Sequence, residues 1–158
     1  MSTANQQRYV RPDPFTRYLF NPLVQLLTRL GISVYGSRIL AVRGRKSGLW
    51  RTTPVNLLEY GGERYLVAPR GVTEWVRNIR QSHSAELRLG ARREPIQVVE
   101  LSDQEKPALL RHYLDRWKWE AGQFFGGVGA DAPQSEIDRI APNHPVFRIT
   151  SGRRTDAR

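Results

Sequence analysis

Apolar side chains recur every three or four positions between residues 14 and 30, a spacing typical of a helix with one apolar face. Asn21 followed by Pro22 is typical of a helix cap and a first helical position, so two helices can meet there. One interpretation is a helix packed on the domain, and the other is a surface anchor for a membrane or an apolar substrate. Packing is favoured, because the polar face carries only Arg17 and Arg29.

From residue 37 onward the apolar positions alternate, which predicts strands. The predicted strands are 37–44, 51–60, 63–69, 85–90, 93–101 and 144–150. Gly61-Gly62 and Ala91-Arg92 separate two pairs of these strands and predict hairpins. Helical patterns cover 73–81, with Thr73 as cap, 102–117, with Ser102 and Glu105 as a capping box, and 134–140.

This order of elements predicts an α+β fold that is mainly β. Strands joined as hairpins form an antiparallel sheet, and six of them with short connections suggest a small closed or split β-barrel with peripheral helices. A doubly wound parallel sheet would need crossover helices that the pattern lacks. We expect an N-terminal tail and amphipathic helix (1–34), one barrel domain (35–150) and a flexible tail (151–158).

The composition narrows the classes of function. The 158 residues contain no cysteine, which excludes disulfides and thiolate metal sites and agrees with a cytoplasmic location. His83, His112 and His144 lie far apart and lack metal-ligand spacing, so no metal is expected. The net charge of +10 favours anionic partners: nucleic acid, phosphate-bearing cofactors or an anionic membrane face. No apolar run approaches the ~18 residues that span a bilayer.

The stretch GRKSGLWRTTP (44–54) concentrates donors and positive charge between two predicted strands. Gly44 and Gly48 permit positive φ, and successive N–H groups in such a turn can form an anion-binding concavity. Phosphate is the natural ligand of these groups. Between positions 38 and 58 the basic side chains, without any acidic one, are Arg38, Arg43, Arg45, Lys46 and Arg51.

The residues themselves leave two interpretations of this turn open. It is neither a Walker loop, in which Gly-Lys-Ser/Thr opens a helix, nor a dinucleotide fingerprint. A solvated turn whose charges serve solubility is as consistent with the pattern as a phosphate site. A second basic segment, 70–93, adds Trp75 and Asn78 on one helical face. These can flank a planar ring and bond its edge, or Trp75 can be a core residue.

Three pieces together resemble one known family. GRKSGLWRTTP, the hairpin that ends in YLVAPRG, and EWVRNIR are similar to the deazaflavin-dependent nitroreductase (nitroreductase/quinone reductase) family. Its members are split β-barrels that bind coenzyme F420, an 8-hydroxy-5-deazaflavin with a phosphate and an oligoglutamate tail. The similarity is plain over 35–101 and looser over 102–150.

The resemblance implies three groups of cofactor-binding residues. Those for the phosphate and acidic tail are Arg45, Lys46, Ser47, Gly48 and Arg51. Those along the deazaflavin ring are Thr52, Thr53, Pro54, Val55 and Asn56. Those at the ring edge, the ribityl chain and the far side of the site are Ala68, Pro69, Arg70, Gly71, Trp75, Val76 and Asn78.

The chain also departs from better-known members. Asn56 stands where they carry a tyrosine, the loop before Trp75 is shorter, and their C-terminal tyrosines over the ring are not matched. The loop 117–129 offers Trp117, Trp119, Phe124 and Phe125 instead. They are expected to bind the acceptor, with the loop glycines permitting motion, or else to pack on the barrel as ordinary buried aromatics.

The implied activity is hydride transfer from reduced F420 to an electron-poor small molecule: a quinone, an enone or a nitro compound. No side chain is assigned a catalytic proton transfer. Alternatives are a flavin mononucleotide enzyme on the same type of barrel, a non-catalytic deazaflavin carrier, or a nucleic-acid-binding module, although no nucleic acid is expected. We expect a cytoplasmic protein, with membrane contact through helix 14–30 as a further hypothesis. The sequence leaves the oligomeric state open.

Overall fold

The computed structural model describes residues 36–118 and 124–150. The expected helix 14–30, residue Trp119 and the tail 151–158 lie outside the described residues. Within the described part of the chain, no helix is both long and apolar enough to span a membrane.

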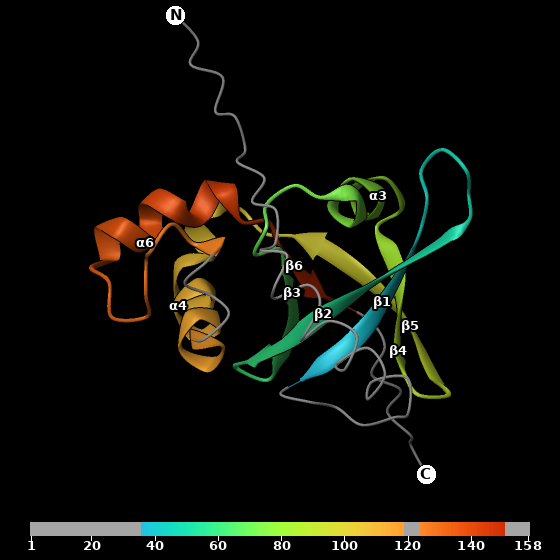
Figure 1. The fold of residues 1–158 in the computed structure, drawn as a ribbon, viewed down its shortest axis with the longest axis horizontal. Coiled ribbons are helices and arrows are strands. Elements are labelled where there is room, and N and C mark those ends of the chain that lie inside the picture. Colours follow the sequence, from blue (N-terminus) through green and yellow to red (C-terminus); the bar gives the residue numbers. More distant parts are fainter. Residues whose placement is uncertain (1–35, 119–123, 151–158) are drawn as a thin grey trace, which may run out of the picture.

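Six antiparallel strands close into a barrel in the order β1-β2-β3-β6-β5-β4 (Figure 1). The fold class expected from the sequence is therefore confirmed. Alternating apolar residues and glycine turns account for the strands, because the apolar face of each strand is buried inside the barrel. Their bounds are β1 Ser37–Arg43, β2 Trp50–Tyr60, β3 Glu63–Val67, β4 Ser84–Leu89, β5 Arg92–Glu100 and β6 Val146–Ile149.

The two longest strands form the corners of the barrel. In β2, residues up to Asn56 pair with β1, and those from Leu57 onward pair with β3. In β5, residues up to Gln97 pair with β4, and those from Val98 onward pair with β6. Each of these strands therefore belongs to both halves of the barrel. The β1–β2 hairpin is in this way connected to β3 and β6 in the other half of the barrel.

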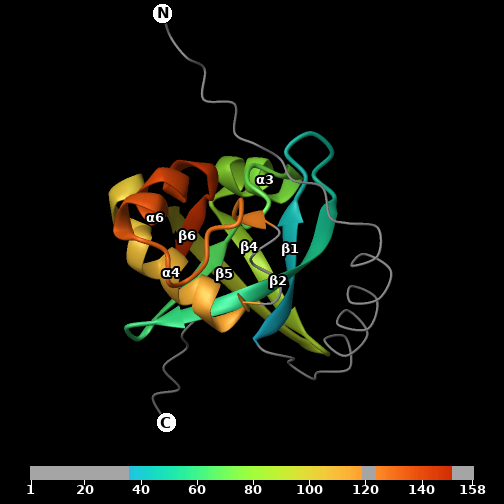
Figure 2. The same cartoon turned by 60° about the vertical axis from the view of Figure 1, so that its left-hand side comes forward.

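Helix α3 (Glu74–Ser82) covers the end of the barrel beside the β1–β2 turn, as Figures 1 and 2 both show. Its buried residues Val76 and Ile79 belong to the same core cluster as the residues inside the barrel. Arg80 fixes the helix to β5 through two hydrogen bonds of 2.8 Å to the Glu100 carboxylate. These contacts fix the helix to the barrel beside the β1–β2 turn.

The expected single helix over 102–117 is divided in two, which corrects the sequence prediction. A 3₁₀ turn, η1 (Asp103–Glu105), precedes α4 (Pro107–Arg116). Pro107 has no N–H to continue the helical ladder, so it starts a new helix instead. The expected pair at the cap is present, because the Glu105 carboxylate accepts the Ser102 N–H at 2.8 Å and its hydroxyl at 3.0 Å.

A second core lies outside the barrel, between its β2–β3 side and the helices α4 and α6 (Gln134–Ile140). Figure 2 shows both helices on this side. A short 3₁₀ turn, η2 (Ala141–Asn143), leads from α6 toward β6. This second core contains the aromatic residues of α4 and of the following loop, and they are therefore held against the barrel.

Candidate functional site

The β1–β2 turn satisfies three of its backbone donors by hydrogen bonds within the turn. The Gly44 N–H donates to the Leu49 carbonyl at 2.8 Å, and the Gly48 N–H donates to the Gly44 carbonyl at 2.8 Å. The Ser47 hydroxyl accepts the Leu49 N–H at 3.2 Å. Gly48 has φ +71°, a conformation that favours glycine. The N–H groups of Gly44, Gly48 and Leu49 are therefore engaged within the turn and are not available to an anion.

Arg45 is engaged with helix α3. Its N–H donates to Asn78 Oδ1 at 3.1 Å, and its Nη1 donates to the same oxygen at 2.9 Å and to Glu74 Oε2 at 2.8 Å. Asn78 is only 4% exposed. Hydrogen bonds from Arg45 and Arg77 hold the pKa of the Glu74 carboxyl below its usual range. Arg45 and Asn78 therefore position the turn on the helix.

Lys46 and Arg51 are the cations of the turn that remain available. Both are exposed, and neither has an ion pair within the described residues. An anion can bind them without breaking an existing salt bridge. Arg43, by contrast, donates to the Gly48 carbonyl at 3.0 Å and lies over the Trp50 ring, 4.3 Å from its centre. Lys46 and Arg51 are thus the side chains best placed to accept a phosphate group.

The five expected ring contacts on β2 are divided between two faces of the strand. Val55 packs against the core inside the barrel, and by strand alternation Thr53 shares this inner face. Thr52, Pro54 and Asn56 lie on the outer face. A planar ring can contact one face only. The outer face suits it better, because the inner one is filled by the core.

Asn56 ends this outer row beside helix α4. Its Nδ2 donates to the Tyr113 hydroxyl at 3.3 Å. Tyr113 is buried, and its ring lies 4.6 Å from that of Trp117 and 5.9 Å from that of Phe125. The sequence analysis assigned Tyr113 no role beyond the helical pattern of 102–117, so its polar contact with Asn56 was missed. Nothing in the helical spacing indicates which strand residue faces a helix.

Residues 68–71 lie in the connection from β3 to α3, at the end of the barrel that α3 covers. Ala68 is buried, and its N–H donates to the Pro145 carbonyl at 2.9 Å. The Arg70 guanidinium lies 5.2 Å from the centre of the Phe124 ring. The Thr73 hydroxyl, at the cap position of α3, is buried and has no hydrogen-bond partner in the described chain. The capping bond expected of Thr73 is therefore absent.

The residues of α3 that were expected to contact the cofactor differ in their exposure to solvent. Val76 is completely buried in the barrel core. Trp75 is partly buried, and its ring centre lies 5.7 Å from that of Phe147 inside the barrel. Trp75 therefore has a core contact and an exposed portion. The two interpretations from the sequence, a core residue and a residue that flanks a planar ring, are therefore compatible.

The aromatic residues expected to bind the acceptor lie mostly in the second core. Trp117 and Phe125 are each 1% exposed, so their rings present almost no surface to a bound molecule. Phe124 is also buried, but it contacts Arg70. Of this group, Phe124 is therefore the one that the structure brings beside the expected cofactor residues, and Trp119 is outside the described chain.

His144 is a buried polar residue that the sequence did not assign to the site. Its Nδ1 lies 3.4 Å from the Ala68 carbonyl oxygen, and its ring centre lies 4.2 Å from that of Phe125. Burial lowers the pKa of its imidazole to about 4, more strongly than its backbone hydrogen bonds raise it. The neutral ring therefore supports the segment that begins at Ala68.

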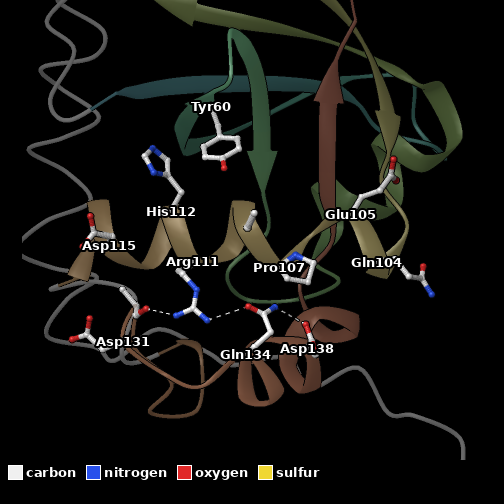
Figure 3. A pocket seen from close by; sticks show the side chains of 12 residues that line it. Tyr60, Gln104, Glu105, Pro107, Arg111, His112, Asp115, Asp131, Gln134 and Asp138 are labelled. Carbon is white, nitrogen blue, oxygen red and sulfur yellow. Dashed lines mark hydrogen bonds between the residues drawn. The ribbon is translucent and has the colours of Figure 1, made fainter.

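A separate surface cleft of about 780 Å³ lies between α4 and α6 (Figure 3). None of the cofactor residues expected from the sequence lines it. Arg111 crosses it and donates to the Ala130 and Ala132 carbonyls at 2.6 and 2.8 Å, so this guanidinium joins α4 to the segment that precedes α6. The acidic residues in its lining are Glu105, Asp115, Asp131 and Asp138.

Comparison with solved structures shows the same fold in several proteins. An F420-H2 dependent reductase (FDR-A) is 20% identical with a TM-score of 0.51, over 72% of this chain and 93% of that one. Atu2129 of Agrobacterium tumefaciens is 16% identical with a TM-score of 0.54, over 90% and 57%. Rv2991 of Mycobacterium tuberculosis is 17% identical with a TM-score of 0.50, over 83% and 80%.

Curated proteins provide no match to this chain. A family model does match it, over residues 24–121, which is more than half of its length. The matched region contains the basic turn, strand β2 and helix α3, the elements that the site is built from. The chain therefore belongs to the F420H(2)-dependent quinone reductase family, and its cofactor is coenzyme F420.

Proposed function

We propose that the protein binds the phosphate of F420 at Lys46 and Arg51, seats the deazaflavin ring on the outer face of β2, and reduces an electron-poor organic acceptor. A quinone, an enone and a nitro compound are the acceptor classes that suit this chemistry. When bound, the reduced coenzyme supplies a hydride to the acceptor. The observation that carries the proposal is that Lys46 and Arg51, exposed cations without an ion pair in the described residues, lie at the end of β2 where its outer row of Thr52, Pro54 and Asn56 begins.

The residues present fit such a molecule. Lys46 provides a point charge and Arg51 a planar fork, which together match the oxygens of a phosphate group. Thr52, Pro54 and Asn56 provide hydroxyl, apolar and amide groups in one row. Arg70 adds a further cation that has no acidic partner in the described chain. The row of Thr52, Pro54 and Asn56 on the outer face of β2, here called the outer strip, is partly apolar and follows the cations. This arrangement is complementary to an anionic chain that ends in a planar ring.

The protein's own part in the reaction is placement. Arg45 and Asn78 fix the turn that carries Lys46, so the cations are preorganised before binding. Tyr113 holds Asn56 at the far end of the strip, where the acceptor would approach. The buried aromatic residues behind this point exclude water from one side of the site. Reduction consumes one hydride and one proton, and solvent supplies the proton.

The test is a titration with oxidised F420, followed by the fluorescence of the coenzyme. Lys46→Ala with Arg51→Ala should weaken binding by at least tenfold, because two charge-assisted contacts are lost. Arg92→Ala with Arg93→Ala is the matched control. It removes the same charge at the β4–β5 turn, which Figure 1 shows at the other end of the barrel. Equal affinity of the two double variants would refute the proposed phosphate site.

The acceptor is tested separately. Reduced F420 is mixed with the protein and with a quinone, an enone or a nitroaromatic compound, and the return of coenzyme absorbance is followed. Turnover with at least one of these classes is expected. If reduced coenzyme binds but no class of acceptor consumes it, the protein is a carrier and the oxidoreductase assignment fails for this chain.

A further inference from the structure

The β1–β2 turn exposes two neighbouring apolar side chains. Leu49 is 62% exposed and Trp50 is 40% exposed. Figures 1 and 2 both show this connection projecting beyond the barrel on the side of α3. Adjacent large apolar side chains at the tip of a projecting hairpin are unfavourable in water, and they are typical of a contact surface.

Positive charge surrounds this apolar pair. The Arg43 guanidinium lies 4.3 Å from the centre of the Trp50 ring, and that of Arg88 lies 5.6 Å from it. Lys46 and Arg51, on either side of the pair in the sequence, have no ion pair within the described residues. No acidic residue occurs between positions 38 and 58. Arg88 is paired with Glu86 at 2.7 Å, so the excess positive charge at the tip comes from Arg43, Lys46 and Arg51.

We propose that the β1–β2 turn docks the protein on a membrane surface that contains anionic lipids. Leu49 would enter the boundary of the acyl chains, and Trp50 would lie at the level of the headgroups, where its amphipathic ring is favoured. The surrounding cations would contact lipid phosphates. A second copy of the chain is a poorer occupant, because two such tips would bring like charges together. A single-stranded nucleic acid is also a poorer occupant, because its bases stack on aromatic rings and not on the aliphatic Leu49.

The apolar side chains of this docking surface are distinct from the cations assigned to the coenzyme phosphate. Trp50 and Arg51 are consecutive residues of an extended strand, so their side chains leave it on opposite faces. In the pairing with β1, Trp50 lies opposite Arg43, whereas Arg51 lies opposite the buried Val42. Leu49 and Trp50 can therefore be replaced without removing the cations assigned to the phosphate, and Trp50 precedes Thr52 on the outer face, at the edge of the row proposed to seat the ring. The inference goes beyond the proposed function, with which it shares Lys46 and Arg51.

The absence of cysteine allows a direct measurement on the full chain. Leu49→Cys is labelled with a fluorophore sensitive to polarity, and so is Val99→Cys, an exposed apolar position on β5. Vesicles contain phosphatidylcholine alone or with about one third phosphatidylglycerol. With anionic vesicles the label at position 49 should move to shorter wavelength and brighten several-fold, and the label at position 99 should not change. Equal responses at both positions would overturn the proposal.

A second measurement uses unlabelled protein. Sedimentation with anionic vesicles should fall about tenfold or more for Leu49→Ser with Trp50→Ser, because the inserted apolar surface is lost. Tyr60→Ser with Val99→Ser is the matched control, since it replaces two other exposed apolar side chains, and it should sediment as the unsubstituted protein does. Moderate salt should weaken binding by screening the cations.

Three results would overturn the docking proposal. One is equal sedimentation of the two double variants. Another is loss of F420 affinity by Leu49→Ser with Trp50→Ser while vesicle binding persists, which would assign the apolar pair to the coenzyme. A third is that the protein binds a single-stranded oligonucleotide in preference to vesicles at the same ionic strength, and that Leu49→Ser with Trp50→Ser weakens this oligonucleotide binding.

Discussion

Asn78 of helix α3 holds Arg45 of the β1–β2 turn through a single oxygen, which accepts both the backbone N–H, at 3.1 Å, and the guanidinium, at 2.9 Å. The same guanidinium donates to Glu74. Backbone and side chain of one residue are therefore tied to one helix. This tie sets the position of the neighbouring Lys46 before any anion binds.

Replacing Asn78 by alanine should release the turn. Two hydrogen bonds to a nearly buried oxygen are lost, so the free energy of unfolding should fall by about 1–3 kcal/mol in urea denaturation. Affinity for F420 should fall as well, because Lys46 is no longer preorganised. Asn78→Asp keeps an oxygen acceptor for Arg45 and should retain more of both. An alanine variant that unfolds and binds as the unsubstituted protein does would show that the tie is irrelevant.

Replacing Glu74 by glutamine should strengthen coenzyme binding. The carboxylate now pairs with Arg45 and Arg77 at 2.8 Å, and its removal leaves the turn more positive by one charge. The gain should be about threefold at low salt, and it should largely disappear at high salt, since exposed pairs contribute little and are screened. Titration at two ionic strengths measures this. Weaker binding at low salt would mean that Glu74 is needed to orient Arg45.

His144 should make stability depend on pH. Burial lowers its pKa to about 4, against an ordinary value of 6.5. The unfolded chain therefore takes up a proton near pH 6.5 that the folded protein takes up only near pH 4. The contribution is fully present above pH 6.5 and is lost progressively as the pH falls toward 4, by about 3 kcal/mol in total.

The measurement is urea denaturation at a series of pH values. His144→Gln keeps a side-chain donor near the Ala68 carbonyl but cannot titrate. The fall in stability between pH 6.5 and 5, above the usual range of carboxyl groups, should therefore be shallower in this variant. Parallel curves for the two proteins in this interval would rule out His144 as the source.

Replacing Tyr113 by phenylalanine should separate packing from polarity at the end of the outer strip. The ring contacts with Trp117 and Phe125 remain, while the hydroxyl that accepts from Asn56 is lost. Stability should fall by about 1 kcal/mol. F420 affinity should persist, and kcat/KM for the acceptor should fall because Asn56 is less well held. A variant with weakened F420 binding and unchanged acceptor kinetics would contradict this placement.

The sequence predicted the strands and helix α3 to within one or two residues at most ends, because alternation and turn glycines are local signals. The last strand is shorter than expected, starting at Val146 after Pro145. Helix 102–117 was misjudged because the apolar pattern runs across Pro107, where a new helix begins. Closure of the barrel by pairing of β1 with β4 links residues far apart in sequence, and periodicity alone does not specify it.

The site was less predictable than the fold. Composition and spacing indicated the cations of the turn, but not that Arg45 is engaged while Lys46 and Arg51 are available. That distinction depends on Asn78, which is 33 positions away in the chain. Trp117 and Phe125 were expected either to bind the acceptor or to pack on the barrel as buried aromatics, and the structure shows them packed. Their burial follows from the packing of α4, which the sequence does not reveal.

The sharing of β2 between the two halves of the barrel has a consequence for its dynamics. Its first part forms one hairpin and its last part another, with the change of partner at Asn56 and Leu57. A ligand that clamps this strand should therefore slow amide hydrogen exchange in β3 and β6, which it never touches. Binding at the site would then lower the exchange rates of amides on strands that do not contact the ligand.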